Sequence, residues 1–311
     1  MSLIKKPSDP VGVKSIRVLL YGQPGIRKTS WSLSAMNPLL FDFDQGIHRV
    51  RAEDRRDYIT MTSWEEAEQA LSEDLSAYNT IVIDTAGKAL ELLAMSIIRD
   101  NPKNAAGGQL SQRGWGVLRD RFSLWRRRVE MLGKNLVFVA HDKEDRGDDE
   151  NSKIVRPDIS GGTLKLLVRD MDLMGYMESR SNVPVVNFSA TDKSWGKNTA
   201  QLPDFIDIRS TSLEDVFGIY RSQQEKLAVF RVKYDLLLGE AETKIAEMTS
   251  VEEFKSFTTW AETLEHVWAS KRLIGLMFSA KVKELGFKYN RETGEYDARI
   301  ETVVSDQSNP A

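Results

Sequence analysis

The sequence predicts an α/β fold with a mostly parallel central sheet, followed by a mainly helical C-terminal region. Three observations indicate this fold: short apolar runs that end in acidic or polar residues, a glycine-containing turn between the first run and the first helix, and long helical periodicity after about residue 210. The expected parts are a flexible N-terminus at 1–14, an α/β core at 15–210, a mainly helical region at 211–300 and a disordered tail at 301–311.

The composition is ordinary for a globular protein and excludes several kinds of chemistry. The 311 residues include no cysteine, which rules out disulfides, thiol catalysis and cysteine-bound zinc. The three histidines are scattered along the chain, so we expect no histidine-rich metal site. No apolar stretch reaches the length of a membrane span, and we expect a cytoplasmic protein with no membrane contact. The net charge of −3 leaves only local basic clusters for nucleic-acid binding.

The first apolar run, which ends at Gly22, leads into a turn typical of phosphate binding. Backbone N–H groups of such a turn, together with the N-terminus of the following helix, point at an anion. Lys28 would reach the β and γ phosphates of ATP, and the Thr29 hydroxyl would hold Mg²⁺. The predicted nucleotide-binding residues are Gly22, Gln23, Pro24, Gly25, Ile26, Arg27, Lys28, Thr29 and Ser30.

Arg27 stands where the phosphate-loop pattern has a glycine immediately before the lysine. A Cβ at this position restricts the backbone angles available to the loop. In the first alternative, the arginine fits because its side chain points outward. In the second, the loop is strained, and the protein would bind nucleotide weakly or turn it over slowly. The sequence leaves both alternatives open.

Further elements of the core follow from apolar runs and caps. A short helix over 30–36 should end before Pro38, and the pair Ser63 and Glu66 has the spacing of a capping box for a helix that extends to about residue 75. The β-branched run at 80–85 suits a buried central strand. The other expected elements are strands at 39–44, 57–61, 135–140, 172–178 and 183–189, helices at 88–99, 117–132 and 164–169, and a closing segment at 201–206.

Acidic or polar residues come at the ends of three of these strands. The carboxyl ends of parallel strands meet at one edge of a sheet, so Asp42, Asp44, Asp84 and His141 should lie beside the phosphate loop. Asp84 would orient Mg²⁺, one of Asp42 and Asp44 would position or deprotonate water, and His141 would sense the γ-phosphate. We expect Asp42 and Asp44, two apart on one strand, to face the same side of the sheet. A single strand-end acid is often only the start of a loop, whereas the ordered set is typical of a nucleotide site.

Two long polar segments, 101–116 and 143–163, interrupt the core and are predicted to be functional loops. The first combines positive charge, amides and an aromatic platform, the chemistry that binds single-stranded nucleic acid, and the second contributes positive charge. The candidate DNA-binding residues are Lys103, Gln112, Arg113 and Trp115 in the first loop, and Lys143, Arg146, Lys153 and Arg156 in the second. Acidic neighbours in the second loop weaken its positive field, which argues against tight binding of DNA. Trp115 in the first loop has an alternative role as part of the apolar core. The arginines of the helix over 117–132 are expected to form a solvated surface.

After residue 210 the pattern changes to helices at 214–218, 223–238, 240–248, 251–257 and 260–285, then a hairpin at 287–296. The sequence does not decide whether this region binds DNA, binds a protein partner or only packs on itself.

The motifs at 22–30, 41–46, 81–85 and 138–141 resemble, in this order, those of RecA-like phosphate-loop ATPases. The likeness covers residues 15–210, and is closest to the short, core-only AAA-type nucleotide-binding proteins of bacteriophages, which are associated with single-strand annealing or recombination. It implies ATP and Mg²⁺ as cofactors and catalytic roles for Lys28, Asp44, Asp84 and His141. The family often has glutamate where this chain has Asp44, and it has no counterpart of Arg27.

The resemblance also implies partners. RecA-like proteins bind nucleotide between protomers, which implies a homo-oligomeric ring or filament, and Lys193 and Lys197 resemble basic residues that reach a neighbour's phosphates. Segments 101–116 and 143–163 take the places of the first and second DNA-binding loops. Single-stranded DNA and a phage or host single-strand-binding protein are the implied partners, in the cytoplasm of a bacterial host. The alternatives are a nucleotide-controlled regulator or assembly factor that acts through protein contacts and, less favoured because no substrate lid is evident, a small-molecule kinase.

Overall fold

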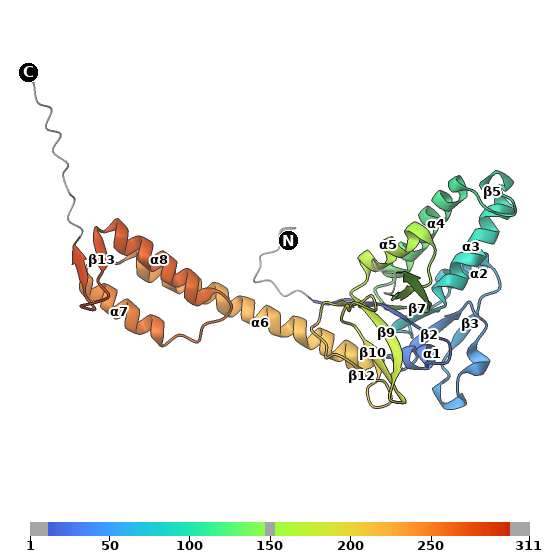
Figure 1. The fold of residues 1–311 in the computed structure, drawn as a ribbon, viewed down its shortest axis with the longest axis horizontal. Helices are drawn as coiled ribbons and strands as arrows, with labels where there is room; N and C mark the ends of the chain where they lie inside the picture. The colour runs from blue at the N-terminus through green and yellow to red at the C-terminus, as the bar shows by residue number, and fades with distance from the viewer. Residues whose placement is uncertain (1–11, 147–152, 299–311) are drawn as a thin grey trace, which may run out of the picture. The chain divides into compact units, whose positions relative to one another are not determined.

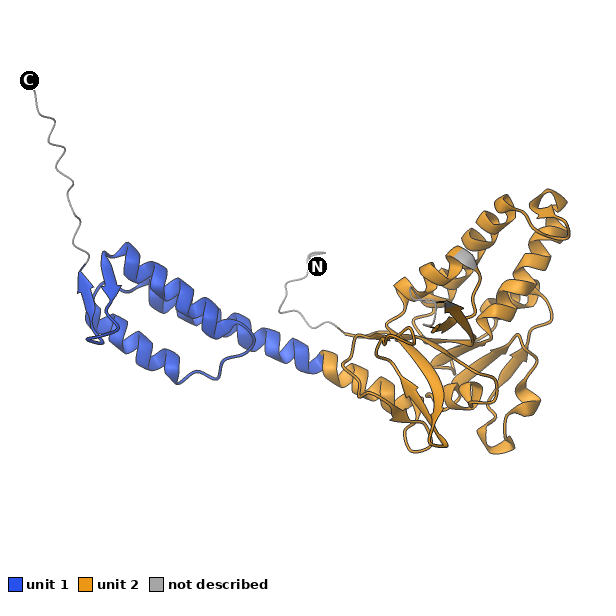
Figure 2. Cartoon of the chain, viewed as in Figure 1, with its two compact units in different colours: residues 1–11, 225–311 blue, residues 12–224 orange. Residues whose placement is uncertain are grey.

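A computed structural model describes residues 12–146 and 153–298 of the chain (Figure 1). The predicted flexible lead-in lies mostly outside the described residues, as do the tail at 301–311 and the middle of the second polar segment, 147–152. The chain forms two compact units (Figure 2). We call residues 12–224 the core unit and residues 225–298 the C-terminal unit, and the division between them falls within one long helix, α6 (Leu213–Ala246).

The core unit is built on one main sheet that runs in the order β12-β10-β9-β1-β7-β4-β2-β3, with β11 paired to β9 and β8 paired to β7. Strands β3, β2, β4, β7, β1 and β9 are mutually parallel, and β10, β11, β12 and β8 are antiparallel additions. The strands are β1 (Arg17–Gly22), β2 (Pro38–Asp42), β3 (Tyr58–Thr60), β4 (Thr80–Asp84), β7 (Asn135–Arg146), β8 (Lys153–Pro157), β9 (Leu173–Arg180), β10 (Val183–Asn187), β11 (Lys197–Asn198) and β12 (Ile206–Asp207). This arrangement, with β7 between β1 and β4, confirms the predicted RecA-like class of the P-loop NTPase fold.

Helices cover both faces of this sheet because residues on each strand alternate between its two faces. On one face, β-strand residues such as Leu19 and Phe138 pack against Trp64, Leu90 and Trp125 of three different helices. On the other face, Val18 and Val137 pack with residues of α1 and of the start of α6. The helices of the core unit are α1 (Lys28–Ser32), α2 (Trp64–Gln69), α3 (Ala86–Asp100), α4 (Gln112–Met131), α5 (Gly161–Asp170) and the first part of α6, with short 3-10 turns η1 (Ile47–Arg49), η2 (Ala52–Asp54), η3 (Ala70–Ser72) and η4 (Pro102–Asn104).

Both predicted DNA-binding loops contain more regular structure than we expected. In the first segment, η4 and a small hairpin of β5 (Ala105–Ala106) and β6 (Gln109–Leu110) come before α4, which begins at Gln112 rather than at residue 117. Ser111 accepts a hydrogen bond from the Gly114 N–H and so caps α4 five residues earlier than the apolar pattern indicated. In the described part of the second segment, the end of β7 pairs in register with β8, and α5 begins at Gly161.

The C-terminal unit consists of the remainder of α6, α7 (Val251–Glu262), α8 (Ser270–Glu284) and a hairpin of β13 (Phe287–Tyr289) and β14 (Tyr296–Ala298). The three helices predicted between 214 and 248 are one continuous helix, and the long one predicted at 260–285 begins only at Ser270. An apolar cluster that includes Phe254, Phe257 and Ile274 holds the unit together. None of the described helices has the length and apolar character needed to cross a membrane.

Candidate nucleotide-binding site

Strand register brings the predicted site residues to one edge of the sheet. Gly22 at the end of β1 lies opposite His141 of β7, and Asp42 at the end of β2 lies opposite Asp84 of β4. Gly22 must be a glycine, because a Cβ there would stand 2.2 Å from the Met177 carbonyl oxygen on β9. The carboxyl ends of β1, β7, β4 and β2 therefore form the floor of the site.

The loop between β1 and α1 has the form of a phosphate cradle. Gln23, Pro24 and Gly25 are exposed at its turn, and Ile26 packs against the core. Lys28 is the first residue of α1, and its ammonium donates hydrogen bonds of 2.7 and 2.8 Å to the carbonyl oxygens of Gly22 and Gln23. Burial lowers the pKa of Lys28. A buried cation held only by the loop's own carbonyls is available to an anion that enters the cradle.

Thr29 and Asp84 meet directly beneath this loop. The Thr29 hydroxyl donates a 2.5 Å hydrogen bond to the Asp84 carboxylate, which is 6% exposed. Burial raises the pKa of Asp84 to about 6, with the negative charges of Asp42 and Asp44 contributing in the same direction. A hydroxyl and a carboxylate oxygen side by side are ligands that Mg²⁺ prefers.

Arg27 occupies the left-handed region of backbone conformation, with φ of 71° and ψ of 27°. A residue with a Cβ pays for this conformation in steric energy that a glycine avoids. The arginine is exposed and lines a polar cavity together with Arg51 and Arg209, away from the carbonyls that hold Lys28. The structure combines a feature of each alternative left open by the sequence, because the arginine is exposed and its backbone is in a strained region.

The two acids after β2 do not share a strand face, contrary to our expectation. The strand ends at Asp42, whose buried carboxylate accepts hydrogen bonds from the backbone N–H groups of Gly46 and Ile47. Asp44 lies beyond the strand, where its own N–H donates to the Asp84 carbonyl and its carboxylate pairs with Arg49. Asp42 therefore shapes the turn, whereas Asp44 stands beside Asp84 with a partly exposed carboxylate.

His141 lies on the floor of the site but also lines a cavity of about 170 Å³ between β7, α3 and α4. Burial lowers its pKa, and its Nδ1 atom has no hydrogen-bond partner in the described part of the chain. Trp115, Lys88 and Asp158 line the same cavity. Lys88 and Asp158 were not among the predicted site residues, because neither follows a recognisable motif and only the packing of α3 and of the segment after β8 brings them to His141.

The site fits a nucleoside triphosphate with Mg²⁺. Lys28 and the N-terminus of α1 would hold the phosphates, and Thr29 and Asp84 would hold the cation. No group of three or more histidine, aspartate or glutamate side chains in the described ranges could bind a metal by itself. The remaining ligands of Mg²⁺ would therefore be phosphate oxygens and water, as is usual for this ion.

The first group of candidate DNA-binding residues gathers at the start of α4. Gln112 and Arg113 are exposed on its first turn, Lys103 is exposed in η4, and Trp115 is 44% exposed. These four belong to helical segments and not to an irregular loop. Not every arginine of this helix is solvated, since Arg126 is buried and pairs with Asp170 and Glu130.

The second group lies on the β7–β8 hairpin, where acidic neighbours neutralise part of it. Lys153 pairs with Glu144 at 2.6 Å, and Arg156 pairs with Asp145. Lys143 is exposed, and Arg156 stands opposite it in the strand register. The side chain of Arg146 lies outside the described residues.

The two lysines predicted to act on a neighbouring protomer have different environments. Lys193 is exposed in the turn before β11. The Lys197 ammonium donates hydrogen bonds to the carbonyl oxygens of Val168 and Arg169 at the end of α5, a favourable position for a cation. The role between protomers stays a prediction for both.

Comparison with known proteins gives a family for the core unit. The profile of an AAA domain family, AAA_24, matches residues 14–200. None of the curated proteins compared with the chain matches it. Among solved structures, the RadB recombinase is 11% identical with a TM-score of 0.34, over 55% of this chain and 79% of that chain. The flagellar accessory protein FlaH from Methanocaldococcus jannaschii is 8% identical with a TM-score of 0.30, over 57% of this chain and 78% of that chain.

Proposed function

The chain belongs to the AAA_24 family of AAA domains and carries a RecA-like P-loop ATPase domain, and on this premise we propose that ATP and Mg²⁺ control its binding to single-stranded DNA. In this proposal the protein acts as an oligomer in annealing or strand exchange, as a bacteriophage recombination protein in the cytoplasm of its host. A phage or host single-strand-binding protein would be a further partner.

The chemistry assigned to each residue follows from its position. Lys28 holds the β and γ phosphates, and Thr29 with Asp84 holds the cation. Bound Mg²⁺ would neutralise negative charge on these phosphates. Asp44 orients or deprotonates the attacking water, because its carboxylate is partly exposed and its backbone N–H is bonded to the Asp84 carbonyl. His141 senses the γ-phosphate from the middle of β7, where it lies opposite Gly22 at the end of β1.

A single observation carries the link to DNA: Trp115 lines the same cavity as His141 and is also 44% exposed at the start of α4. An exposed indole is a stacking surface for a base, and Arg113 on the same turn of α4 and Lys103 in η4 supply positive charge. A base stacked on Trp115 would thus alter the packing around the γ-phosphate sensor, and ATP would alter the stacking surface in return.

The test is a gel-shift titration with single-stranded DNA, with and without ATP and Mg²⁺. The proposal predicts a specific complex whose affinity depends on ATP. If the complex is no stronger than non-specific binding in both conditions, the DNA-binding function is excluded.

One observation favours a second candidate, a nucleotide-controlled regulator that acts through protein contacts. The ion pairs of Lys153 and Arg156 reduce the free positive charge on the β7–β8 hairpin, and with it the attraction to a phosphate backbone. This candidate predicts that ATP changes the light scattering of the protein in the absence of DNA, while no gel shift appears.

A further inference from the structure

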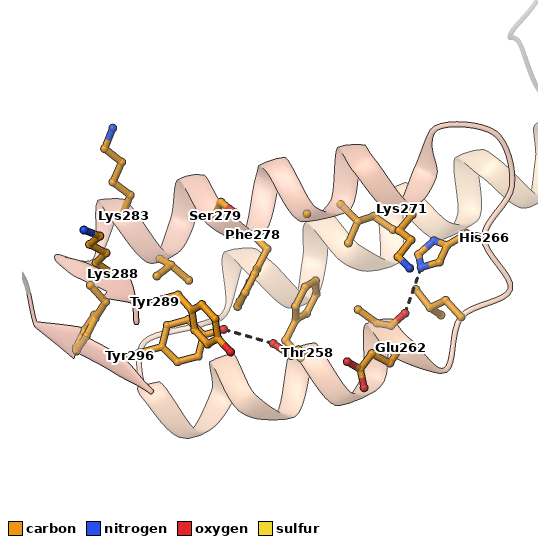
Figure 3. Close-up of a pocket in the computed structure, with 17 residues that line it drawn as sticks. Thr258, Glu262, His266, Lys271, Phe278, Ser279, Lys283, Lys288, Tyr289 and Tyr296 are labelled. Atoms are coloured by element: carbon orange, nitrogen blue, oxygen red, sulfur yellow. Dashed lines mark hydrogen bonds between the residues drawn. The ribbon is translucent and has the colours of Figure 1, made fainter. Parts of the chain in front are cut away.

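The C-terminal unit contains a groove that plays no part in the function proposed above. It lies between α7, α8 and the β13–β14 hairpin and has a volume of about 730 Å³ (Figure 3). Phe257, Ile274, Phe278, Val282 and Phe287 line it with apolar surface. A groove of this size, lined mainly by apolar side chains with a few polar groups around it, is typical of a ligand or peptide site.

Among the described residues, three lysines of the groove have no acidic partner, whereas three lysines elsewhere in this unit do. Lys271, Lys283 and Lys288 line it, are exposed, and form no ion pair in the part of the chain that the structure describes. Figure 3 shows Lys283 and Lys288 at the hairpin end and Lys271 near His266 at the other end. The lysines of the unit that do pair with glutamates are elsewhere: Lys233 with Glu265, Lys255 with Glu295 and Lys281 with Glu284.

This positive charge is local. Within residues 225–298, acidic residues outnumber basic ones, yet Glu262 is the one acidic side chain among the groove's lining residues. A general affinity for polyanions would draw on positive charge over the whole unit, whereas the excess of positive charge described here is confined to the groove. A short acidic ligand that reaches only the groove is matched to this charge distribution.

The aromatic rings of the groove also favour a peptide over a nucleic acid. Phe257 and Phe278 stack on each other with centroids 4.9 Å apart, and Phe278 meets the edge of Phe254. Tyr289 and Tyr296 pack together at 5.1 Å. The paired phenylalanine rings give an apolar wall for a peptide side chain, whereas a base would need a free ring face such as that of Tyr289, which is 49% exposed.

We propose that this groove binds an acidic peptide segment of a partner protein, with bulky apolar side chains of the peptide between α7, α8 and the hairpin, and its carboxylates on Lys271, Lys283 and Lys288. Apolar anchors in the groove supply the affinity, and the lysines at its two ends select for negative charge. The binding is independent of nucleotide, since no residue of the phosphate cradle takes part.

The test uses the full chain and the fluorescein-labelled octapeptide EEDFELDE, followed by fluorescence anisotropy. Matched peptides EEDSESDE and KKRFKLRK remove the apolar side chains or invert the charge. The first protein variant is Lys271→Ala with Lys283→Ala and Lys288→Ala, and its control replaces the paired lysines Lys233, Lys255 and Lys281 by alanine. We expect the first variant to lose about tenfold in affinity for EEDFELDE, and the control to keep it.

A second pair of variants tests the groove itself without touching charge. No heavy atom lies within 4 Å of the Cβ position of Gly275 or Gly239, so a larger side chain is accommodated at both. Gly275 lines the groove on α8, whereas Gly239 lies on α6 outside it. Gly275→Phe should abolish binding of the peptide, and Gly239→Phe should leave it unchanged.

Several results would overturn the proposal. The first is that EEDFELDE does not bind. The second is that EEDSESDE binds as tightly as EEDFELDE. The third is that the groove variants and their controls lose the same affinity for EEDFELDE. Displacement of EEDFELDE by a thymidine oligonucleotide, with the same variants losing oligonucleotide binding, would instead assign the groove to single-stranded nucleic acid. A chain that ends at residue 298 shows whether the last residues compete: tighter peptide binding by it would assign the groove to the chain's own tail and overturn binding of a partner.

Discussion

The Thr29 hydroxyl lies 2.5 Å from the Asp84 carboxylate, and this hydrogen bond joins the first helix to the end of a central strand. The two residues are 55 positions apart in the sequence. Their contact sets the place where the cation of a nucleotide would bind, and it determines how the site should respond to pH.

Affinity for Mg²⁺-nucleotide should fall as the pH drops below about 6. Burial raises the pKa of Asp84 from 3.8 to about 6, so the carboxyl becomes protonated there and loses the charge that holds the cation. The folding stability of the free protein changes with pH in the opposite direction. The raised pKa of Asp84 stabilises the folded state fully below pH 3.8, and this stabilisation is lost as the pH rises through 6. A fluorescent ATP analogue titrated at several pH values measures the affinity, with a decline of about tenfold per pH unit expected.

Asp84→Asn is the control for this pH dependence. The ionisation of the nucleotide is common to both proteins, so the difference between them isolates Asp84. A wild-type profile parallel to that of Asp84→Asn would contradict the prediction.

Lys28→Ala should weaken nucleotide binding while the fold remains. The buried ammonium donates to two carbonyl oxygens of the loop, and a phosphate would replace these as its partner. Loss of a charged contact corresponds to about 10- to 100-fold in affinity. The fluorescent ATP analogue again reports binding, and Lys165→Ala, an exposed lysine on α5, serves as the matched control. Similar affinities in the two variants would argue against the cradle.

Arg27→Gly should stabilise the protein and raise its ATPase rate. A glycine adopts φ of 71° without the steric cost borne by a residue with a Cβ, about 1 kcal/mol, although its extra freedom in the unfolded chain offsets part of this gain. Urea unfolding measures the change in the free energy of unfolding. Arg27→Ala separates the causes, because it removes the guanidinium but keeps the Cβ. Equal gains in both variants would trace the effect to the side chain and not to the backbone.

Asp44→Asn and Asp42→Asn should have different effects, although the residues are two apart. Asp44→Asn removes the proposed base and should lower the turnover rate by about 10²- to 10⁴-fold, with nucleotide affinity retained. Asp42→Asn weakens the hydrogen bonds to the N–H groups of Gly46 and Ile47 and should cost about 1–3 kcal/mol of stability. Steady-state ATPase assays and thermal unfolding distinguish the two. Normal turnover in Asp44→Asn would assign the base to another residue.

Trp115→Ala should weaken binding to single-stranded DNA by about 1–3 kcal/mol, the contribution of one stacked base. It should also change the ATP dependence of that binding, because Trp115 lines the cavity that contains His141. Gel-shift titrations with and without ATP measure both effects. Trp268, which is 52% exposed in the C-terminal unit, supplies the control Trp268→Ala. An equal effect of the two substitutions would remove Trp115 from the proposed DNA surface.

The sequence by itself determined the parts of the site that depend on local spacing. The strand–turn–helix at Gly22 to Thr29 and the acid that ends β4 are readable because phosphate binding fixes glycine, lysine and hydroxyl at set intervals along the chain. The predicted capping box of Ser63 and Glu66 is present. It too depends on local spacing, because both partners lie within one helical turn.

Only the tertiary structure showed which polar side chains are held by hydrogen bonds or ion pairs within the protein and which are free to contact a ligand. Asp42 and Asp44 have the same chemistry in the sequence, but backbone N–H groups surround the first and Arg49 reaches the second. The unpaired lysines of the C-terminal groove became distinguishable from their paired neighbours only after α7, α8 and the hairpin were placed together. Contacts between segments distant in the chain depend on packing and strand register, and a linear pattern carries no record of either.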